Sequence, residues 1–143
     1  MRKFIDIFEK FPIEYISFMF IASALIIKVD NGSIYDIFYI VISILITMII
    51  ACTIKSIWEN KRDYKHPIKL FENRMPSFHA AVAFAGSGSV AIILGCQHIW
   101  SYIVILFACL AAVSRLRYHK WYEIIVGIFI GVIICTIIRH PFE

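Results

Sequence analysis

The sequence predicts an all-α protein, a polytopic transmembrane helix bundle with about five membrane spans. Of its 143 residues, 61% are apolar and only 17% are charged, and the mean hydropathy is +0.82. Soluble domains are typically about 45–50% apolar and about 25% charged, and disordered chains combine low hydrophobicity with high charge. Both classes are therefore excluded. We treat residues 1–143 as a single membrane domain.

Five apolar runs account for this composition. A helix needs about 20 apolar residues to cross the hydrocarbon core, and about 17–25 is the usual range. In the first run, Glu14 and Lys28 lie near the ends, where charged side chains can reach the interface. The second run carries no charge after Asp36. The predicted spans lie near residues 11–29, 35–54, 77–96, 99–113 and 122–138.

The last three spans show how the bundle is expected to pack. Only Gln97 and His98 separate the third span from the fourth, and they follow Gly95, a suitable helix C-cap, so these two spans should form a tight antiparallel hairpin. The fourth and fifth spans are short, which predicts local thinning of the bilayer or snorkelling. Gly127 and Gly131 form a GxxxG pattern that allows close helix approach.

The cysteines and histidines give no pattern typical of a metal site or a disulfide framework. The four cysteines lie within or at the end of apolar runs, with no CxxC spacing. We interpret them as small buried apolar residues, and we expect neither a metal nor a cofactor. They are Cys52, Cys96, Cys109 and Cys135.

Basic residues are concentrated on one side of the predicted bundle. With five spans, the N-terminus and the loops 55–76 and 114–121 share one face, and only Lys28 and Arg139 fall on the other. Removing four candidate phosphate ligands still leaves 8 basic residues against 2, so the positive-inside rule predicts a cytoplasmic N-terminus and first face. The 12 basic residues of that face are Arg2, Lys3, Lys10, Lys55, Lys61, Arg62, Lys65, Lys69, Arg74, Arg115, Arg117 and Lys120.

The same face collects polar side chains at the ends of helices, and together they suit phosphoryl transfer. That reaction needs cations and hydrogen-bond donors for the phosphate oxygens, a nucleophile, and an acid for the leaving oxygen. A net charge of only +4 gives no argument for nucleic acid, so we predict a small anionic ligand at the membrane. The candidates are the cations Lys55, Arg62, Arg115 and Arg117, the hydroxyl of Ser77, the imidazoles of His79 and His119, and the carboxylate of Glu123.

In order and position, these residues resemble the type 2 phosphatidic acid phosphatase superfamily of integral membrane lipid phosphatases. The pattern of that family is Lys-x6-Arg-Pro, then Pro-Ser-Gly-His, then Ser-Arg-x5-His-x3-Asp. The resemblance covers residues 50–131. The corresponding blocks of this chain are Lys55-x6-Arg62, Pro76-Ser77-Phe78-His79 and Ser114-Arg115-x3-His119-x3-Glu123.

The resemblance implies a metal-independent phosphatase that works through a phosphohistidine. It implies that His119 is the nucleophile, Glu123 its orienting carboxylate and His79 the general acid. It also implies that the phosphate is held by Lys55, Arg62, Ser77 and Arg115. Because the stretch from Arg115 to His119 is shorter than the family spacing, Arg117 is a further candidate, in place of Arg115 or alongside it. Substrates of this kind are polyprenyl diphosphate, phosphatidate or phosphatidylglycerophosphate.

The chain departs from the family pattern at several points. Asp63 replaces the proline, Phe78 replaces the glycine, and Glu123 replaces the aspartate. The gap between Arg115 and His119 is two residues shorter than usual, and the commoner architecture of the family has six spans. Three alternatives therefore stay open: a lipid phosphotransferase, a non-catalytic protein that binds anionic lipid or a partner, and a small channel or transporter subunit. The last of these predicts ionisable residues in mid-span, which the five spans lack.

Overall fold

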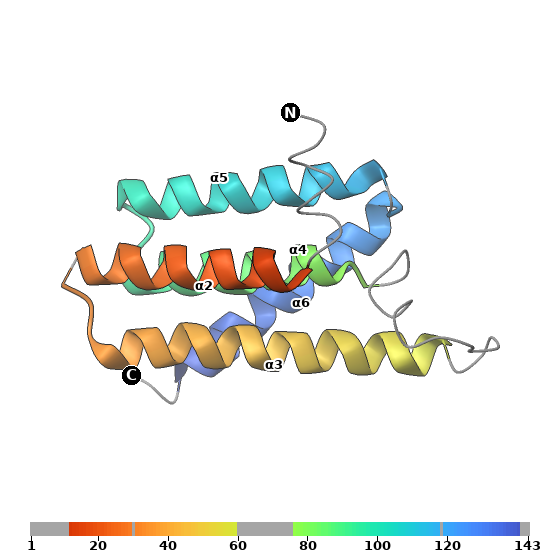
Figure 1. Ribbon diagram of the computed structural model, residues 1–143, viewed down its shortest axis with the longest axis horizontal. Coiled ribbons are helices and arrows are strands. Elements are labelled where there is room, and N and C mark those ends of the chain that lie inside the picture. Colours follow the sequence, from red (N-terminus) through yellow and green to blue (C-terminus); the bar gives the residue numbers. More distant parts are fainter. Residues whose placement is uncertain (1–11, 30, 60–75, 118, 141–143) are drawn as a thin grey trace.

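The computed structural model is an all-α helix bundle, as predicted (Figure 1). It describes residues 12–29, 31–59, 76–117 and 119–140, and within these ranges there is no strand. The basic residues of the first 11 positions and of the stretch 60–75 lie outside the described residues. The elements are α2 (Pro12–Val29), α3 (Ile34–Glu59), α4 (Phe78–Leu94), α5 (Ile99–Ser114), the short 3₁₀ helix η2 (Arg115–Arg117) and α6 (Trp121–Arg139).

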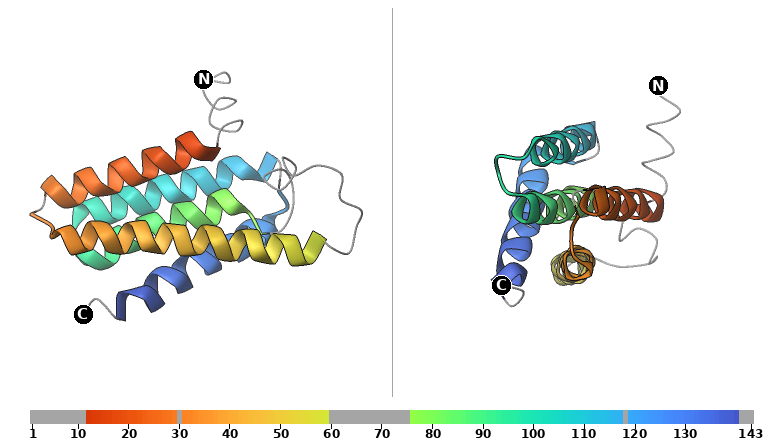
Figure 2. Two further views of the ribbon diagram at one scale, coloured as in Figure 1. Left: turned by 60° about the horizontal axis from the view of Figure 1, so that its bottom comes forward. Right: turned by 90° about the vertical axis from the view of Figure 1, so that its left-hand side faces the viewer.

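Helix α4 is the centre of the bundle. It contacts α2, α3, α5 and α6, and these four helices surround it (Figure 2). Its buried side is rich in alanine and serine, so its neighbours can approach closely. Helix α6 does not run parallel to the others. It starts beside the end of α5 and crosses α4 to end beside the start of α3 (Figures 1 and 2).

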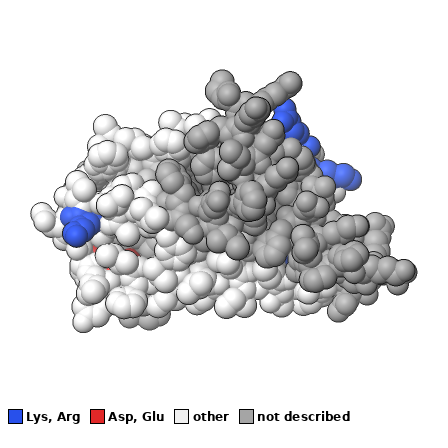
Figure 3. All heavy atoms as spheres, in the orientation of Figure 1, with Lys and Arg blue, Asp and Glu red and all other residues white. Residues whose placement is uncertain are grey.

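Three of the described helical segments have the length of a membrane span, and the bundle has an apolar outer surface. Within the described residues, the segments Ile34–Ile57, Ile99–Arg117 and Trp121–Arg139 are long and apolar enough to cross a bilayer, and Phe20–Val29 and Phe78–Leu94 are shorter apolar helices. Many large apolar side chains point outward, for example that of Phe107. On the face seen in Figure 3, the described Lys and Arg atoms lie toward the two ends of the long axis. These are features of an integral membrane protein.

Helix boundaries agree with the predicted spans to within two residues, with one exception. Helix α3 continues to Glu59, more than a turn beyond Lys55, so Lys55 lies inside the helix and does not end it. An apolar run marks the hydrocarbon core, and polar residues that favour helix can extend the helix beyond it. The predicted hairpin is confirmed: Gly95 has φ +85° and donates its N–H to the carbonyl of Ala91, and α5 starts at Ile99.

Two of the four cysteines are not where the sequence predicted them. Cys135 is buried and Cys52 is partly buried, but Cys96 and Cys109 are exposed, and all four are free. Cys96 lies in the turn between α4 and α5, and Cys109 lies on the outer face of α5. The prediction of burial was wrong for Cys109 because an apolar run does not distinguish the lipid-facing side of a helix from the packed side. It was wrong for Cys96 because α4 ends at Leu94, before the apolar run does.

The two glycines of the GxxxG pattern bring α6 against the backbone of α4. A Cβ atom on Gly127 would lie 2.5 Å from the carbonyl oxygen of Ser77, and one on Gly131 would collide with the carbonyl oxygen of Ala81. Both contacts are with main-chain atoms, which cannot rotate away. The glycines therefore determine how closely the middle of α6 approaches the first half of α4.

We expect Gly127→Ala to destabilise the protein by about 1–3 kcal/mol, the usual cost of overpacking a tight contact. Gly88→Ala is the matched control, because its new methyl group would meet only the Cys135 Sγ atom, at 2.7 Å, and that side chain can adjust. Thermal unfolding of the purified protein in detergent would measure both changes. Equal unfolding temperatures for Gly127→Ala and the wild type would contradict the proposed close contact.

Candidate active site

Four chain segments meet at one end of the bundle and carry nearly all the predicted site residues. They are the final turns of α3, the start of α4, the stretch from the end of α5 through η2, and the start of α6 (Figure 1). A main-chain hydrogen bond joins two of these segments, because the N–H of Ser77 donates to the carbonyl oxygen of Glu123 at 3.1 Å. The start of α4 is therefore held directly against the first turn of α6.

His119 and Glu123 form a buried pair at the start of α6. Nδ1 of His119 lies 3.0 Å from Oε2 of Glu123, and the His119 residue is only 7% exposed. The same carboxylate oxygen accepts the backbone N–H of Lys120 at 3.2 Å, so it also caps the helix. Because Glu123 is fixed by the helix start, the imidazole is held with Nδ1–H donating and Nε2 available.

The charge state of His119 depends on burial and on its neighbours. Desolvation lowers the pKa of His119 below its usual value of 6.5, and Lys55 and Arg115 act in the same direction, while Glu123 raises the pKa in part. The net direction is downward. At neutral pH the imidazole is therefore uncharged, which is the form in which Nε2 carries a lone pair.

The short Arg115-to-His119 connection is a single tight turn that brings both residues inward. The N–H of His119 donates to the carbonyl oxygen of Arg115 at 2.9 Å. Arg115 begins the short helix η2, which ends at Arg117, two residues before His119. Arg115 is 8% exposed, whereas Arg117 is exposed. Residues four apart on such a turn lie on one side of it. The structure therefore brings Arg115 into the site and leaves Arg117 on the outer surface.

His79 lies in the first turn of α4 and is buried beside the other site residues. It is 5% exposed, and it interacts electrostatically with Lys55, Arg115 and His119. The ring of Phe78 meets the ring of His79 edge-on, with 5.9 Å between their centroids. Phe78 is itself part of the apolar core, so the imidazole of His79 packs against a buried ring.

The hydroxyl of Ser77 does not cap helix α4. It is the N-cap residue of α4, yet its side chain makes no capping hydrogen bond, and Oγ has no hydrogen-bond partner among the described residues. The residue is completely buried. Buried hydroxyls normally find a partner, and an orphaned one at a helix N-terminus is well placed to bind an oxygen of an anion.

Lys55 gives the site a second buried cation. It is 2% exposed on α3, and it acts electrostatically on both His79 and His119. Lys55 and Arg115 outnumber Glu123, the carboxylate beside His119, so these described charges sum to a positive value. A positive, buried group of this kind favours an anionic ligand.

Some of the motif residues are not brought together. Arg62 and Asp63 lie outside the described residues, so the predicted contact of Arg62 with phosphate stays a prediction. Ser114 is exposed, and its hydroxyl donates to the carbonyl oxygen of Ala111 within the last turn of α5. The described residues contain no group of three His, Cys, Asp or Glu side chains that could hold a metal ion.

No family model, curated protein or solved structure matches the chain. The interpretation of the site therefore depends on its own geometry and on the three sequence blocks. Sequence reasoning missed one contributor, the backbone N–H of Lys120, which helps to hold Glu123. The signal for it was present, since Glu123 follows Lys120 by three residues at the start of an apolar helix, which is the position of the carboxylate in a capping box.

Proposed function

We propose that the chain is a membrane lipid phosphatase of the type 2 phosphatidic acid phosphatase kind, which hydrolyses a lipid phosphate monoester or diphosphate through a phosphohistidine. The observation that supports this best is the buried His119–Glu123 pair, with Nδ1 and Oε2 3.0 Å apart, beside a second histidine and two buried cations. This set contains a nucleophile, its orienting carboxylate, an acid and phosphate ligands.

The proposed reaction has two steps. Nε2 of His119 attacks phosphorus, the bond from phosphorus to the lipid oxygen breaks, and His79 gives that oxygen a proton. A bound phosphate dianion favours the protonated form of His79 that this step needs. Water then attacks the phosphohistidine, the P–N bond breaks, and His79 accepts the proton that the water loses. Lys55, Arg115 and Ser77 hold the phosphate oxygens throughout.

The position of the site at a helix end suits a lipid substrate. A headgroup at the bilayer surface can reach His119 while its chain stays among the lipids that cover the outer apolar faces. We propose polyprenyl diphosphate, phosphatidate or phosphatidylglycerophosphate as the substrate class, with no nucleic acid partner and no metal. If an alcohol takes the phosphoryl group from His119 in place of water, the same site is a phosphotransferase.

The decisive experiment is phosphate release by the purified protein from these three lipids, with EDTA present and with a short alcohol as an optional acceptor. We expect release from at least one lipid, unchanged by EDTA, because none of the proposed steps uses a metal. Complete loss of activity that magnesium restores would contradict the mechanism. Tight binding of the lipids without any release would favour the non-catalytic alternative.

We propose that the site faces the cytoplasm, and the native Cys96 allows a direct test. This thiol is exposed in the α4–α5 turn, at the end of the bundle opposite His119. An impermeant maleimide is therefore expected to label wild-type protein in intact cells and to leave Cys96→Ser unlabelled. In the Cys96→Ser background, His66→Cys should react only after permeabilisation, and labelling of this variant in intact cells would reverse the assigned orientation.

A further inference from the structure

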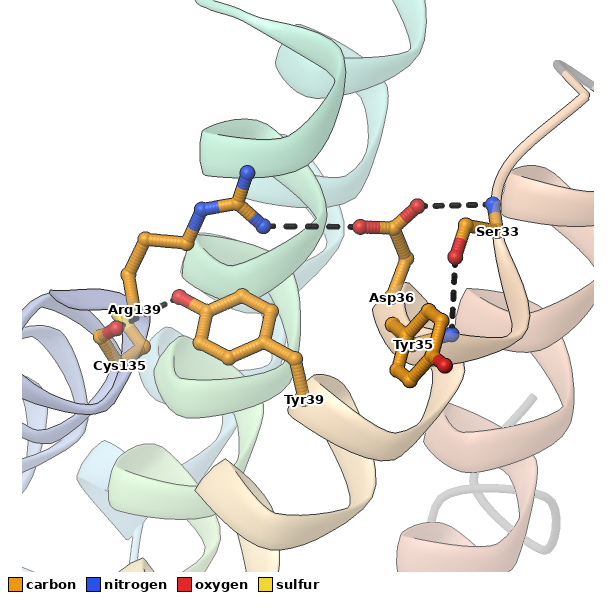
Figure 4. Close-up of polar contacts among 6 residues, drawn as sticks. All are labelled: Ser33, Tyr35, Asp36, Tyr39, Cys135 and Arg139. Atoms are coloured by element: carbon orange, nitrogen blue, oxygen red, sulfur yellow. Dashed lines mark hydrogen bonds and ion pairs between the residues drawn. The ribbon is translucent and has the colours of Figure 1, made fainter. Parts of the chain in front are cut away.

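A second polar cluster joins the start of α3 to the end of α6 (Figure 4), at the opposite end of the bundle from the start of α6 (Figure 1). The hydroxyl of Tyr39 on α3 donates to the carbonyl oxygen of Cys135 on α6 at 2.6 Å, and Tyr39 is completely buried. The guanidinium of Arg139 lies 5.5 Å from the centroid of the Tyr39 ring, and its Nη1 lies 3.5 Å from Oδ1 of Asp36. We call Asp36, Tyr39, Cys135 and Arg139 the far-end clamp.

Asp36 uses its two carboxylate oxygens for different helices. Oδ2 accepts the backbone N–H of Ser33 at 2.8 Å, and the hydroxyl of Ser33 accepts the N–H of Tyr35 at 3.0 Å, so this group caps the start of α3. Oδ1 is turned toward Arg139 in the last turn of α6 (Figure 4). Because the cap fixes the carboxylate, the end of α6 meets a rigid partner.

The contacts of α6 fall into three groups along the helix. Its first turn carries Glu123, its middle lies against α4 at Gly127 and Gly131, and its end reaches the far-end clamp on α3. Glycine allows close approach, but it has no side chain that could interlock with the neighbouring helix. The glycine contact therefore sets the separation of α4 and α6, while their crossing angle depends on contacts nearer the ends of α6.

We propose that Asp36, Tyr39 and Arg139 are positioning residues, which set the tilt of α6 from one membrane face and thereby the placement of Glu123 and His119 at the other. The same clamp ties α6 to α3, the helix that carries Lys55. Its release would let α6 swing about its contacts with α4, and the carboxylate that orients His119 would move relative to Lys55 on α3. The effect on catalysis depends on the proposed phosphatase function, whereas the effect on helix tilt does not.

The tilt is measured directly by double electron–electron resonance. Spin labels are attached at Ile57→Cys on α3 and Ile125→Cys on α6, both exposed positions, in a background without the native cysteines. Tyr39 bonds to the carbonyl oxygen of Cys135, so Cys135→Ala keeps that bond. We expect Arg139→Gln and Tyr39→Phe each to shift or broaden the distance distribution. The control is Lys28→Gln, which removes an exposed charge on the same face and should leave the distance distribution unchanged.

Phosphate release by the same variants tests the consequence for the site. We expect kcat to fall by up to about 100-fold, the loss that a displacement of about 1 Å can cause, while KM changes little. Arg139→Lys should restore part of the loss, because it keeps the charge. If Asp36→Asn does not fold because the cap of α3 is lost, Tyr39→Phe still tests the clamp, because it leaves that cap intact.

The outcomes separate the two proposals. A distance distribution in Arg139→Gln and Tyr39→Phe identical to that of the wild type would overturn the proposed clamp. A changed distribution with unchanged kcat would overturn the positioning role. If the wild type releases no phosphate from any lipid, the proposed function fails, and the distance measurement still decides whether the clamp sets the tilt of α6.

Discussion

Phosphate release by His119→Ala is expected to fall to the background rate. The substitution removes the imidazole that the carboxylate of Glu123 orients, and with it the covalent route. Release is measured on the lipid that the wild type hydrolyses fastest. If His119→Ala kept most of the wild-type turnover on every lipid tested, the assignment of His119 as the nucleophile would be wrong.

Two further measurements keep this prediction specific. The wild type should yield a trapped phosphohistidine that is labile in acid and stable in base, and His119→Ala should yield none. Glu123→Gln is the matched variant, since it keeps the size of the side chain but removes its charge. It should leave the helix start in place and still lower activity, because the charged form of His119 loses its stabilising partner.

Replacement of His79 by alanine is expected to lower activity by about 10²–10⁴-fold, the usual contribution of a general acid or base. The loss should depend on the leaving group. The leaving group of a nitrophenyl phosphate or of a lipid diphosphate needs less protonation than the alkoxide released from a lipid phosphate monoester, so the loss should be smaller for the first two. The measurement is kcat/KM of the variant and of the wild type on all three substrates, and the ratio of the two values gives the loss for each substrate.

The control for this prediction is the phosphohistidine itself. His79→Ala should still form the intermediate from a good leaving group, because the attack by His119 does not require His79. An equal loss on all three substrates would contradict the role of acid and would assign His79 to phosphate binding.

Most of the fold could be predicted from the sequence because hydrophobicity alone determines where a chain can cross a bilayer. The hairpin at Gly95 and the close approach at Gly127 and Gly131 follow from the properties of glycine. The end of α3 could not be predicted, since the single turn beyond Lys55, residues 56–59, mixes polar and apolar side chains and is as compatible with helix as with loop. The tilt of α6 could not be predicted either, because it depends on contacts between residues nearly 100 positions apart.

The candidate site was predictable in its members but not in their orientation. Helix ends on one face identified His79, His119 and Glu123, and these lie together in the structure. The sequence could not decide between Arg115 and Arg117, because the choice depends on the turn that closes onto His119. It also gave no sign that Arg139, which counted only as a charge on the opposite face, would meet Asp36.

The central position of α4 has a consequence for how the protein is made. Its 17 residues are mainly alanine, glycine, serine and valine, so it is far less hydrophobic than a leucine-rich span, and the imidazole of His79 in its first turn adds a further penalty. Such a segment gains little by moving into lipid on its own. During synthesis α4 is therefore expected to remain near the translocon until α5 and α6 emerge and cover it. Truncation of the chain before Trp121 should leave α4 poorly inserted, although every residue of α4 is present.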